Sequence, residues 1–166
     1  MTENSWHLAQ VNVARLVAPL DSPQLAGFVG ELDPINVIAD RSPGFVWRLQ
    51  TEDGDATAIR PFDDDRILVN MSVWESIEAL GRFVFESRHL EVLRRRREWF
   101  EKMAEAYLAL WWIPAGTIPT IADAKTRLIC LRQHGPTPFA FTFREPFPAP
   151  GATESVATDD HWLCPA

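Results

Sequence analysis

The sequence predicts an α+β protein in which a ferredoxin-like antiparallel sheet carries its helices on one face. Two observations predict this fold. Segments in which apolar and polar residues alternate, as they do in strands, are interspersed with segments whose apolar residues follow helical spacing. Their order along the chain is β-α-β-β-α-α-β-α-β, and its first part is the split βαβ pattern of ferredoxin-like sheets.

Four segments are expected to form the main strands because they are rich in β-branched and aromatic residues. They lie at residues 7–16, 45–50, 67–72 and 107–113, and a short β-like segment follows at 139–143. Residues 51–66 include six acidic residues and few apolar ones, so we expect an exposed loop there. The aspartates of this loop lack the alternating ligand spacing of a calcium site, and no metal site is expected.

Helix starts are indicated by capping residues that precede apolar residues at helical spacing. The expected starts are Asp21, Ser72 in the capping box Ser72-Val-Trp-Glu75, Ser87 and Thr120. Asp33-Pro34 is expected to interrupt the first helix, because proline cannot donate the hydrogen bond that a helix interior needs. The helix that starts at Ser87 is expected to point four apolar side chains inward, at Leu90, Leu93, Phe100 and Met103.

Residues 1–150 are expected to form one domain, and residues 151–166, which are rich in proline, alanine and acidic residues, are expected to form a mobile tail. Within the domain, the second face of the sheet also carries large apolar residues. Helices on one face alone would leave these residues exposed to water. We therefore expect a second copy of the chain to cover this face, which predicts a homodimer.

Charge and composition exclude several classes of protein. The formal net charge is −7, which disfavours nucleic-acid binding because the phosphate backbone requires a basic surface. The two cysteines show neither ligand nor disulfide spacing. The N-terminus does not resemble a signal peptide, and no apolar run approaches membrane-spanning length. We therefore expect a cytoplasmic protein with no nucleic-acid or membrane partner.

Residues 70–112 contain four of the seven tryptophans and are the expected location of a functional site. His89 is a candidate for proton transfer because histidine titrates near neutral pH; a hydrogen-bonded histidine at a helix junction is the other interpretation. Asn70 is costly to bury in a strand without a partner, so it either binds a substrate oxygen or bonds to a neighbouring loop. Arg82 is a charge among apolar neighbours, and it either pairs with a carboxylate or holds an anionic substrate group.

Other residues are expected to contact the substrate. Closely spaced indole rings suit either a core or a pocket for a flat organic molecule. Trp111 and Trp112 point to opposite faces of their strand, so at most one of them can line a given cavity. The expected substrate-binding residues are Trp47, Arg48, Trp74, Phe85 and Trp112.

Five blocks of the sequence together resemble one bacterial family, the domain of unknown function 3291. They are NVIADRSPGFVWRLQ at 36–50, NMSVWES at 70–76, SRHLEVLRRRREWF at 87–100, LWWIPAGTIPT at 110–120 and GPTPFAFTFREPFPAP at 135–150. This family looks like a branch of the dimeric α+β barrel superfamily, alongside antibiotic-biosynthesis monooxygenases. The resemblance covers roughly residues 6–150. It implies a ferredoxin-like protomer whose sheet joins that of a partner to form a barrel, with a cavity between sheet and helices.

The resemblance leaves three hypotheses about function open, because members of the superfamily include cofactor-free oxygenases, haem enzymes, cyclases and proteins without a known reaction. The first is a small-molecule enzyme without an organic cofactor. It would oxygenate, cyclise or isomerise a flat, apolar, polyketide-like substrate, with His89 moving a proton and Asn70 with an arginine stabilising an enolate. The second is a haem-binding enzyme or carrier with His89 as the iron ligand. The third is a non-catalytic dimer that binds a metabolite.

Overall fold

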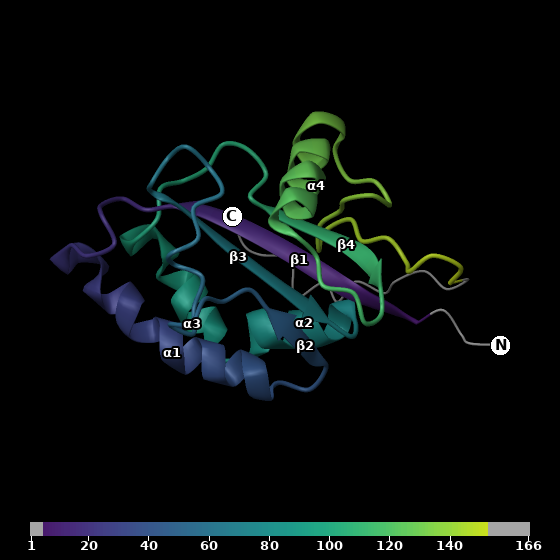
Figure 1. Ribbon diagram of the computed structural model, residues 1–166, viewed down its shortest axis with the longest axis horizontal. Helices are drawn as coiled ribbons and strands as arrows, with labels where there is room; N and C mark the ends of the chain where they lie inside the picture. The colour runs from purple at the N-terminus through teal and green to yellow at the C-terminus, as the bar shows by residue number, and fades with distance from the viewer. Residues whose placement is uncertain (1–4, 153–166) are drawn as a thin grey trace.

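The computed structural model describes residues 5–152, and the rest of the predicted tail lies outside them. Four antiparallel strands form one sheet in the spatial order β2-β3-β1-β4 (Figure 1). The strands are β1 (Trp6–Arg15), β2 (Phe45–Arg48), β3 (Ile67–Trp74) and β4 (Leu108–Pro114). This spatial order, with helices between β1 and β2 and between β3 and β4, is that of a ferredoxin-like fold. The predicted fold class is therefore confirmed.

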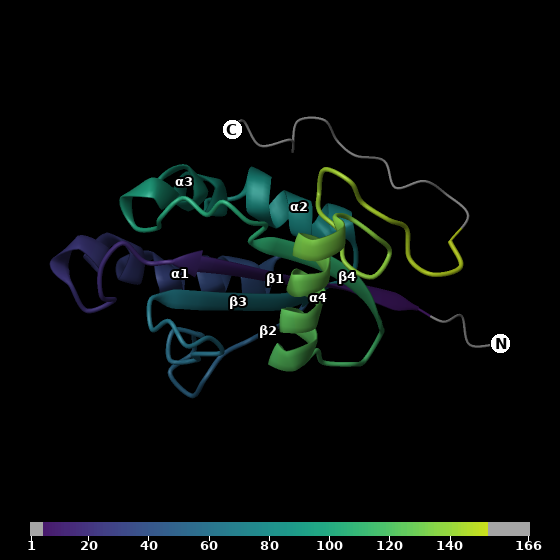
Figure 2. The same ribbon diagram turned by 90° about the horizontal axis from the view of Figure 1, so that it is seen from above.

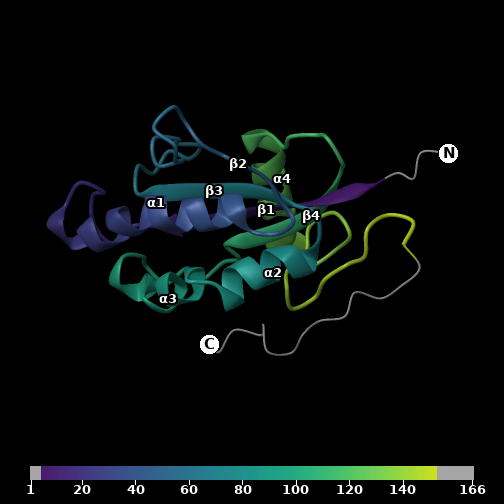
Figure 3. The ribbon, with the colours of Figure 1, turned by 90° about the horizontal axis from the view of Figure 1, so that it is seen from below.

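Three helices lie on one face of the sheet, which we call the helix-covered face. They are α1 (Ala26–Arg41), α2 (Ile77–Glu86) and α3 (His89–Arg94), with short 3-10 turns at Pro23–Leu25 and Arg96–Glu98. Figure 3 shows α1 running beside α2 and α3. On this face Leu8, Trp74 and Leu110 pack against Leu80 of α2. Sequence alternation places these side chains on one side of their strands, as expected.

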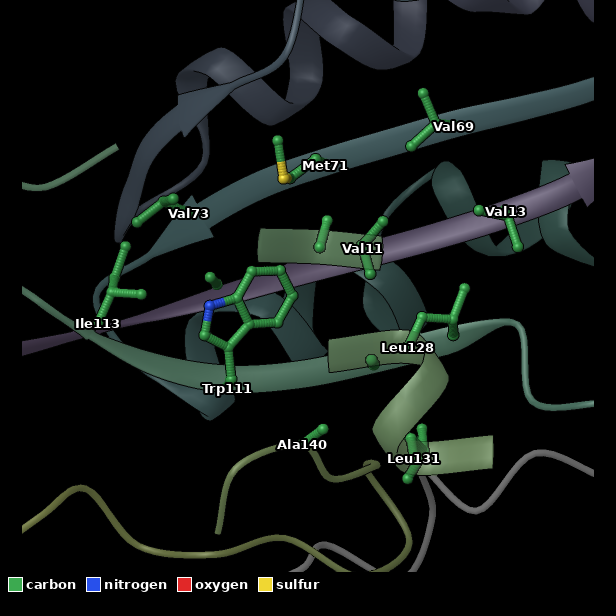
Figure 4. Close-up of a cluster of buried hydrophobic side chains, with 13 residues drawn as sticks. Val11, Val13, Val69, Met71, Val73, Trp111, Ile113, Leu128, Leu131 and Ala140 are labelled. Carbon is green, nitrogen blue, oxygen red and sulfur yellow. The ribbon is translucent and has the colours of Figure 1, made fainter. Parts of the chain in front are cut away.

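The last helix, α4 (Ile121–His134), lies on the opposite face, which we call the second face (Figures 1 and 2). Its apolar side chains pack on the strands around Trp111, which is 1% exposed, and Met71, which is also 1% exposed (Figure 4). Leu49, just before the acidic loop, and Phe62, within it, pack on the same cluster. The second face is thus covered by the chain itself. The expectation that only a second subunit could cover it was wrong, although dimerisation remains a prediction.

Two helix predictions fail for reasons of packing. Helix α1 continues through Pro34, because it packs against β2 and α3 and this burial outweighs one lost backbone hydrogen bond. Helix α3 stops at Arg94, and the backbone turns at Arg95 instead of continuing to Met103. The turn brings Trp99 under α1, where its ring lies 5.8 Å from that of Phe28.

The start of α2 was also predicted at the wrong serine. Strand β3 extends to Trp74, because Ser72 and Trp74 pair with β1 and the indole is fully buried. Ser76 caps α2 instead, with its hydroxyl accepting a hydrogen bond from the amide of Ala79 at 3.1 Å. Ser72 is therefore free to contribute its side chain to the face of the sheet. The predicted cap at Thr120 is confirmed as a full capping box with Asp123.

Gly44 joins α1 to β2 in a conformation that should tolerate no side chain. Its φ is +82°, and an added Cβ would lie 2.6 Å from the Cβ of Ala79. Gly44→Ala should therefore lower the free energy of unfolding by about 2–4 kcal/mol, measured by urea denaturation. Gly30→Ala is the matched control, since an added Cβ there meets nothing within 4 Å and removes helix flexibility. A loss at Gly30 equal to that at Gly44 would contradict this explanation.

Candidate functional site

Four polar side chains meet on the helix-covered face of the sheet, and we call them the polar cluster. They come from two neighbouring strands, where Gln10 of β1 lies opposite Ser72 of β3 and Asn12 lies opposite Asn70. Each strand contributes two polar residues, two positions apart, so that all four point to the same face. The cluster lies between apolar neighbours on the same face, including Leu8.

Gln10 connects the members of this cluster. Its side chain is only 4% exposed, and its Nε2 donates to Asn70 Oδ1 at 2.7 Å and to Ser72 Oγ at 2.9 Å. Its Oε1 accepts a hydrogen bond from Asn12 Nδ2 at 3.3 Å. A buried carboxamide without partners is costly, and these three bonds offset that cost. The cluster is therefore a connected network rather than four separate residues.

Asn70 is where this network reaches solvent. Its residue is exposed, whereas Leu68 and Ser72, its neighbours on the same face of β3, are 8% and 7% exposed. Asn70 Oδ1 accepts from Gln10 Nε2, and Asn12 Nδ2 lies 3.4 Å from the same oxygen. With Oδ1 turned toward β1, Nδ2 is the end of the carboxamide that points away from the network, on the solvent-exposed side of Asn70 that we call the opening. It donates no hydrogen bond to any residue that the structure describes.

An aromatic row continues from the polar cluster toward α3. Trp74 Nε1 donates to Ser72 Oγ at 2.8 Å, which fixes the indole ring against the cluster. Phe83 of α2 stacks on Trp74 with ring centroids 5.1 Å apart and an interplanar angle of 23°. The ring of His89 lies 4.9 Å from that of Phe83. The row thus connects His89 to the cluster through two aromatic rings.

His89 is held in one tautomer. Its Nδ1 lies 3.2 Å from the carbonyl oxygen of Val84, which can only accept, so Nδ1 carries the proton and donates. Its backbone amide donates to Ser87 Oγ at 3.1 Å. Burial lowers the pKa of His89 below its ordinary value, and the hydrogen bond to Val84 opposes this only in part. The imidazole is therefore neutral at pH 7, and Nε2 carries a lone pair that can take a proton.

The structure brings together some of the predicted site residues. Asn70 and Trp74 are joined through Ser72, and His89 lies at the far end of the aromatic row. Trp112 lies on the same face, where its Nε1 donates to the carbonyl oxygen of Phe147 at 2.8 Å. Phe85 packs edge-on against Phe143, with centroids 5.3 Å apart.

The other predicted residues lie elsewhere. Trp47 packs on the second face, away from Asn70. Arg48 forms an ion pair with Asp40 at 2.7 Å and donates to the carbonyl oxygen of Gly54 at 2.6 Å, so it ties the acidic loop to α1. Arg82 is exposed on α2. Arg48 pairs with Ser72 of the polar cluster across β2 and β3, but within residues 5–152 no side-chain hydrogen bond joins Trp47, Arg48 or Arg82 to the cluster.

Sequence reasoning missed Gln10 and Asn12 as members of the site. A signal was present, because polar residues two positions apart interrupt the apolar alternation in both β1 and β3. Ser72 was assigned to a helix cap, which concealed the pattern in β3. Phe83 gave no comparable signal, since a phenylalanine on an amphipathic helix is most simply explained as core.

Two hollows outlined by the described residues lie away from this network. An open groove of about 740 Å³ is lined at one end of the sheet by Leu16, Leu20, Val29, Arg60 and Arg66, among others. A much smaller void of about 10 Å³ lies under α4 on the second face. Neither of these two hollows is lined by Asn70, Trp74 or His89.

Within residues 5–152, no group of three His, Cys, Asp or Glu side chains could hold a metal ion. No helix in the same range is long and apolar enough to cross a membrane.

For haem, His89 Nε2 is the available ligand atom, because Nδ1 is engaged by Val84. Phe83 limits how well haem would fit there, because its ring lies against the imidazole.

A family model described as "Domain of unknown function (DUF3291)" matches residues 7–158. The chain belongs to this family. The match confirms the predicted resemblance and covers all of the sheet but its first residue, Trp6, together with all four α-helices and the polar cluster. No curated protein matches this member of DUF3291.

Three solved structures are similar to this DUF3291 protein in part of their backbone. The cofactor-independent oxygenase SnoaB from Streptomyces nogalater is 19% identical, with a TM-score of 0.44 over 68% of this chain and 95% of its own. PA3566 from Pseudomonas aeruginosa is 14% identical, with a TM-score of 0.45 over 69% of this chain and 99% of its own. The protein NE2512 from Nitrosomonas europaea, of unknown function, is 10% identical, with a TM-score of 0.42 over 71% and 99% of the two chains.

Proposed function

We propose that this protein is a small-molecule enzyme that acts on a flat, apolar, polyketide-like substrate without a bound organic cofactor. Oxygenation, cyclisation and isomerisation of such substrates share one first step, in which a proton leaves a carbon that is conjugated with a carbonyl group through the ring system. The electron pair of the broken C–H bond moves onto the carbonyl oxygen, which becomes an enolate. The enzyme therefore needs a base for the proton and a hydrogen-bond donor for the oxygen.

The observation that carries this proposal is the exposed carboxamide of Asn70 on a buried polar network. Its Nδ2 faces the opening and can donate to a substrate oxygen, because Oδ1 is already held by Gln10. A donor fixed in advance stabilises developing negative charge without having to reorganise during the reaction. Trp74 holds the network from the buried side, because its Nε1 donates to Ser72 Oγ.

His89 supports the proposal as the base. Its neutral imidazole can accept a proton at Nε2, because burial lowers its pKa and Nδ1 is occupied by Val84. His89 and Asn70 are not in contact; Trp74 and Phe83 lie between them. The two groups therefore suit a fused-ring substrate whose acidic carbon lies away from its carbonyl but is conjugated with it through the rings, with the carbonyl at Asn70 and the acidic carbon toward His89.

Binding of a substrate oxygen at Asn70 is tested with two ligands that differ in one carbonyl group. 1-Indanone, which carries a ketone, should bind more tightly than indane, which lacks it, as measured by isothermal titration calorimetry. Asn70→Ala should remove this preference, a change of about fivefold for one neutral hydrogen bond. Gln133→Ala is the matched control, because Gln133 is an exposed amide on α4. Equal affinities of the unaltered protein for both ligands would count against the proposed function.

A haem protein is the alternative that His89 leaves open. Haem bound through His89 Nε2 would give an absorbance band near the Soret region in the purified protein or after addition of hemin. The band should disappear in His89→Gln while the fold is retained. On the proposed function, no band that depends on His89 should form.

We also propose that the protein is a homodimer. Three large apolar side chains on or near α4 remain exposed in the single chain: Ile118 at 62%, Ile129 at 47% and Phe139 at 42%. Light scattering at micromolar concentration should give twice the chain mass of 18.8 kDa. A mass of one chain would show that α4 replaces the partner altogether.

A further inference from the structure

The two ends of the Asn70 carboxamide have opposite hydrogen-bonding character, and only one of them can face the opening. With Nδ2 outward, the site offers a donor and selects ligands that carry an acceptor oxygen. With Oδ1 outward, it would offer an acceptor and select ligands that carry an N–H or O–H group. The orientation of this one side chain therefore decides which class of ligand the site accepts.

We propose that Gln10 is a positioning residue that fixes the orientation of Asn70 and thereby makes the site specific for ligands with a hydrogen-bond acceptor oxygen. This inference rests on the proposed function for its ligand and on the polar cluster for its geometry. Gln10 Nε2 lies 2.7 Å from Asn70 Oδ1. Rotating Asn70 alone by half a turn would place its Nδ2 against Nε2, where two donors face each other without a hydrogen bond.

Gln10 is itself held in place. The hydrogens of its Nε2 bond to Asn70 Oδ1 and Ser72 Oγ, and its Oε1 accepts from Asn12 Nδ2. Rotating Gln10 would bring its Nε2 against the donor of Asn12. Reversal thus requires three carboxamides to rotate together, inside a network in which Gln10 is 4% exposed. Trp74, which donates to Ser72 Oγ from the other side, limits this movement further.

The decisive variant is Gln10→Glu. An ionised glutamate has the same shape but can only accept, so Asn70 must turn its Nδ2 inward and present Oδ1 to the opening. The probes are 1-indanone, which offers an acceptor, and indole, an N–H donor. Both are fused five- and six-membered ring systems of similar size. The unaltered protein should bind 1-indanone about fivefold more tightly than indole, and Gln10→Glu should reverse this ratio at pH 8. An unchanged ratio in a folded Gln10→Glu protein would overturn the proposal.

The pH dependence of this variant separates positioning from structural damage. At low pH the introduced glutamate is protonated, donates again through its O–H group and should restore the preference for 1-indanone. A purely structural defect would not reverse with protonation. Gln10→Met, which has similar volume and no hydrogen-bonding group, provides a second variant if the glutamate does not fold. Gln10→Met should bring the affinities for 1-indanone and indole close to equal. A preference for 1-indanone that stays near fivefold would contradict the role of Gln10.

Nuclear magnetic resonance tests the orientation of the Asn70 side chain without any ligand. In the unaltered protein the side-chain amide protons of Gln10 should exchange slowly with water and those of Asn70 quickly. In Gln10→Glu at pH 8 the Asn70 protons should become protected, because they now donate to the carboxylate. Fast exchange of Asn70 in both proteins would refute the positioning role. If the exchange pattern is as expected and neither probe binds, the proposed function fails while the role of Gln10 stands.

Discussion

Replacing His89 with glutamine should slow proton abstraction by about 10²–10⁴-fold while leaving the fold intact, which is the usual contribution of a general base. The reaction can be followed without knowing the natural substrate. 1-Indanone carries exchangeable hydrogens next to its ketone, and their replacement by deuterium in D₂O is visible by proton NMR. The unaltered protein should accelerate this exchange, because Nε2 of neutral His89 can take the proton.

The pH profile provides an independent check on His89. Burial lowers its pKa below the ordinary 6.5, so the exchange rate should rise with pH below that value and level off above it. The lowered pKa also makes stability depend on pH. The unfolded chain binds the proton more readily, so His89 should reduce stability as pH falls below about 6.5. His89→Gln should remove both pH dependences.

Two control results bear on the alternatives for His89. His134→Gln removes an exposed histidine at the end of α4 and should leave the exchange rate unchanged. If His89→Gln instead costs about 1 kcal/mol of stability and leaves the exchange rate unaltered, His89 is a hydrogen-bonded junction residue. The protein would then be better described as a metabolite-binding protein without catalysis by this residue.

Replacing Trp111 with alanine should lower the free energy of unfolding by about 3–5 kcal/mol, the largest stability effect that we expect. Trp111 is 1% exposed and lies at the centre of the cluster between the sheet and α4 (Figure 4). Its removal leaves a cavity that the surrounding strands cannot close. Urea denaturation followed by circular dichroism measures the loss.

Phe139→Ala is the matched control for Trp111. Both rings lie under the guanidinium of Arg127, at 5.9 Å for Trp111 and 3.7 Å for Phe139, but Phe139 is 42% exposed. The control should therefore cost far less stability in the monomer. Similar losses for the two variants would show that the second face is not a closed core within one chain.

The four main strands and their ferredoxin-like arrangement could be predicted from sequence, because the β-rich segments are separated by recognisable turns and helices. The exposed loop at residues 51–66 and the capping box at Thr120 followed from local chemistry in the same way. The placement of α4 on the second face could not be predicted. Its apolar stripe at Ala124, Leu128 and Leu131 specifies a buried side but does not specify which surface it meets.

The candidate site was predictable only in part, because it depends on whether Ser72 starts a helix or continues a strand. A serine followed three residues later by glutamate is a strong local signal for a helix start. The pairing of Ser72 with Gln10 across the sheet outweighed that signal, since it buries Trp74. Asn70 could be identified as an unusual residue from β3 alone. Its orientation could not, because this is set by Gln10, 60 positions earlier in the chain.

The position of α4 also has a consequence for synthesis. The ribosome releases β1 first and α4 last among the described elements, yet both belong to the same buried cluster. While the nascent chain grows, Val11, Met71 and Trp111 lack the cover that α4 gives the second face until residues 121–134 emerge. Exposed apolar strands at that stage favour aggregation and chaperone binding. Premature termination before Ile121 would thus yield a chain with all four strands and a permanently uncovered sheet.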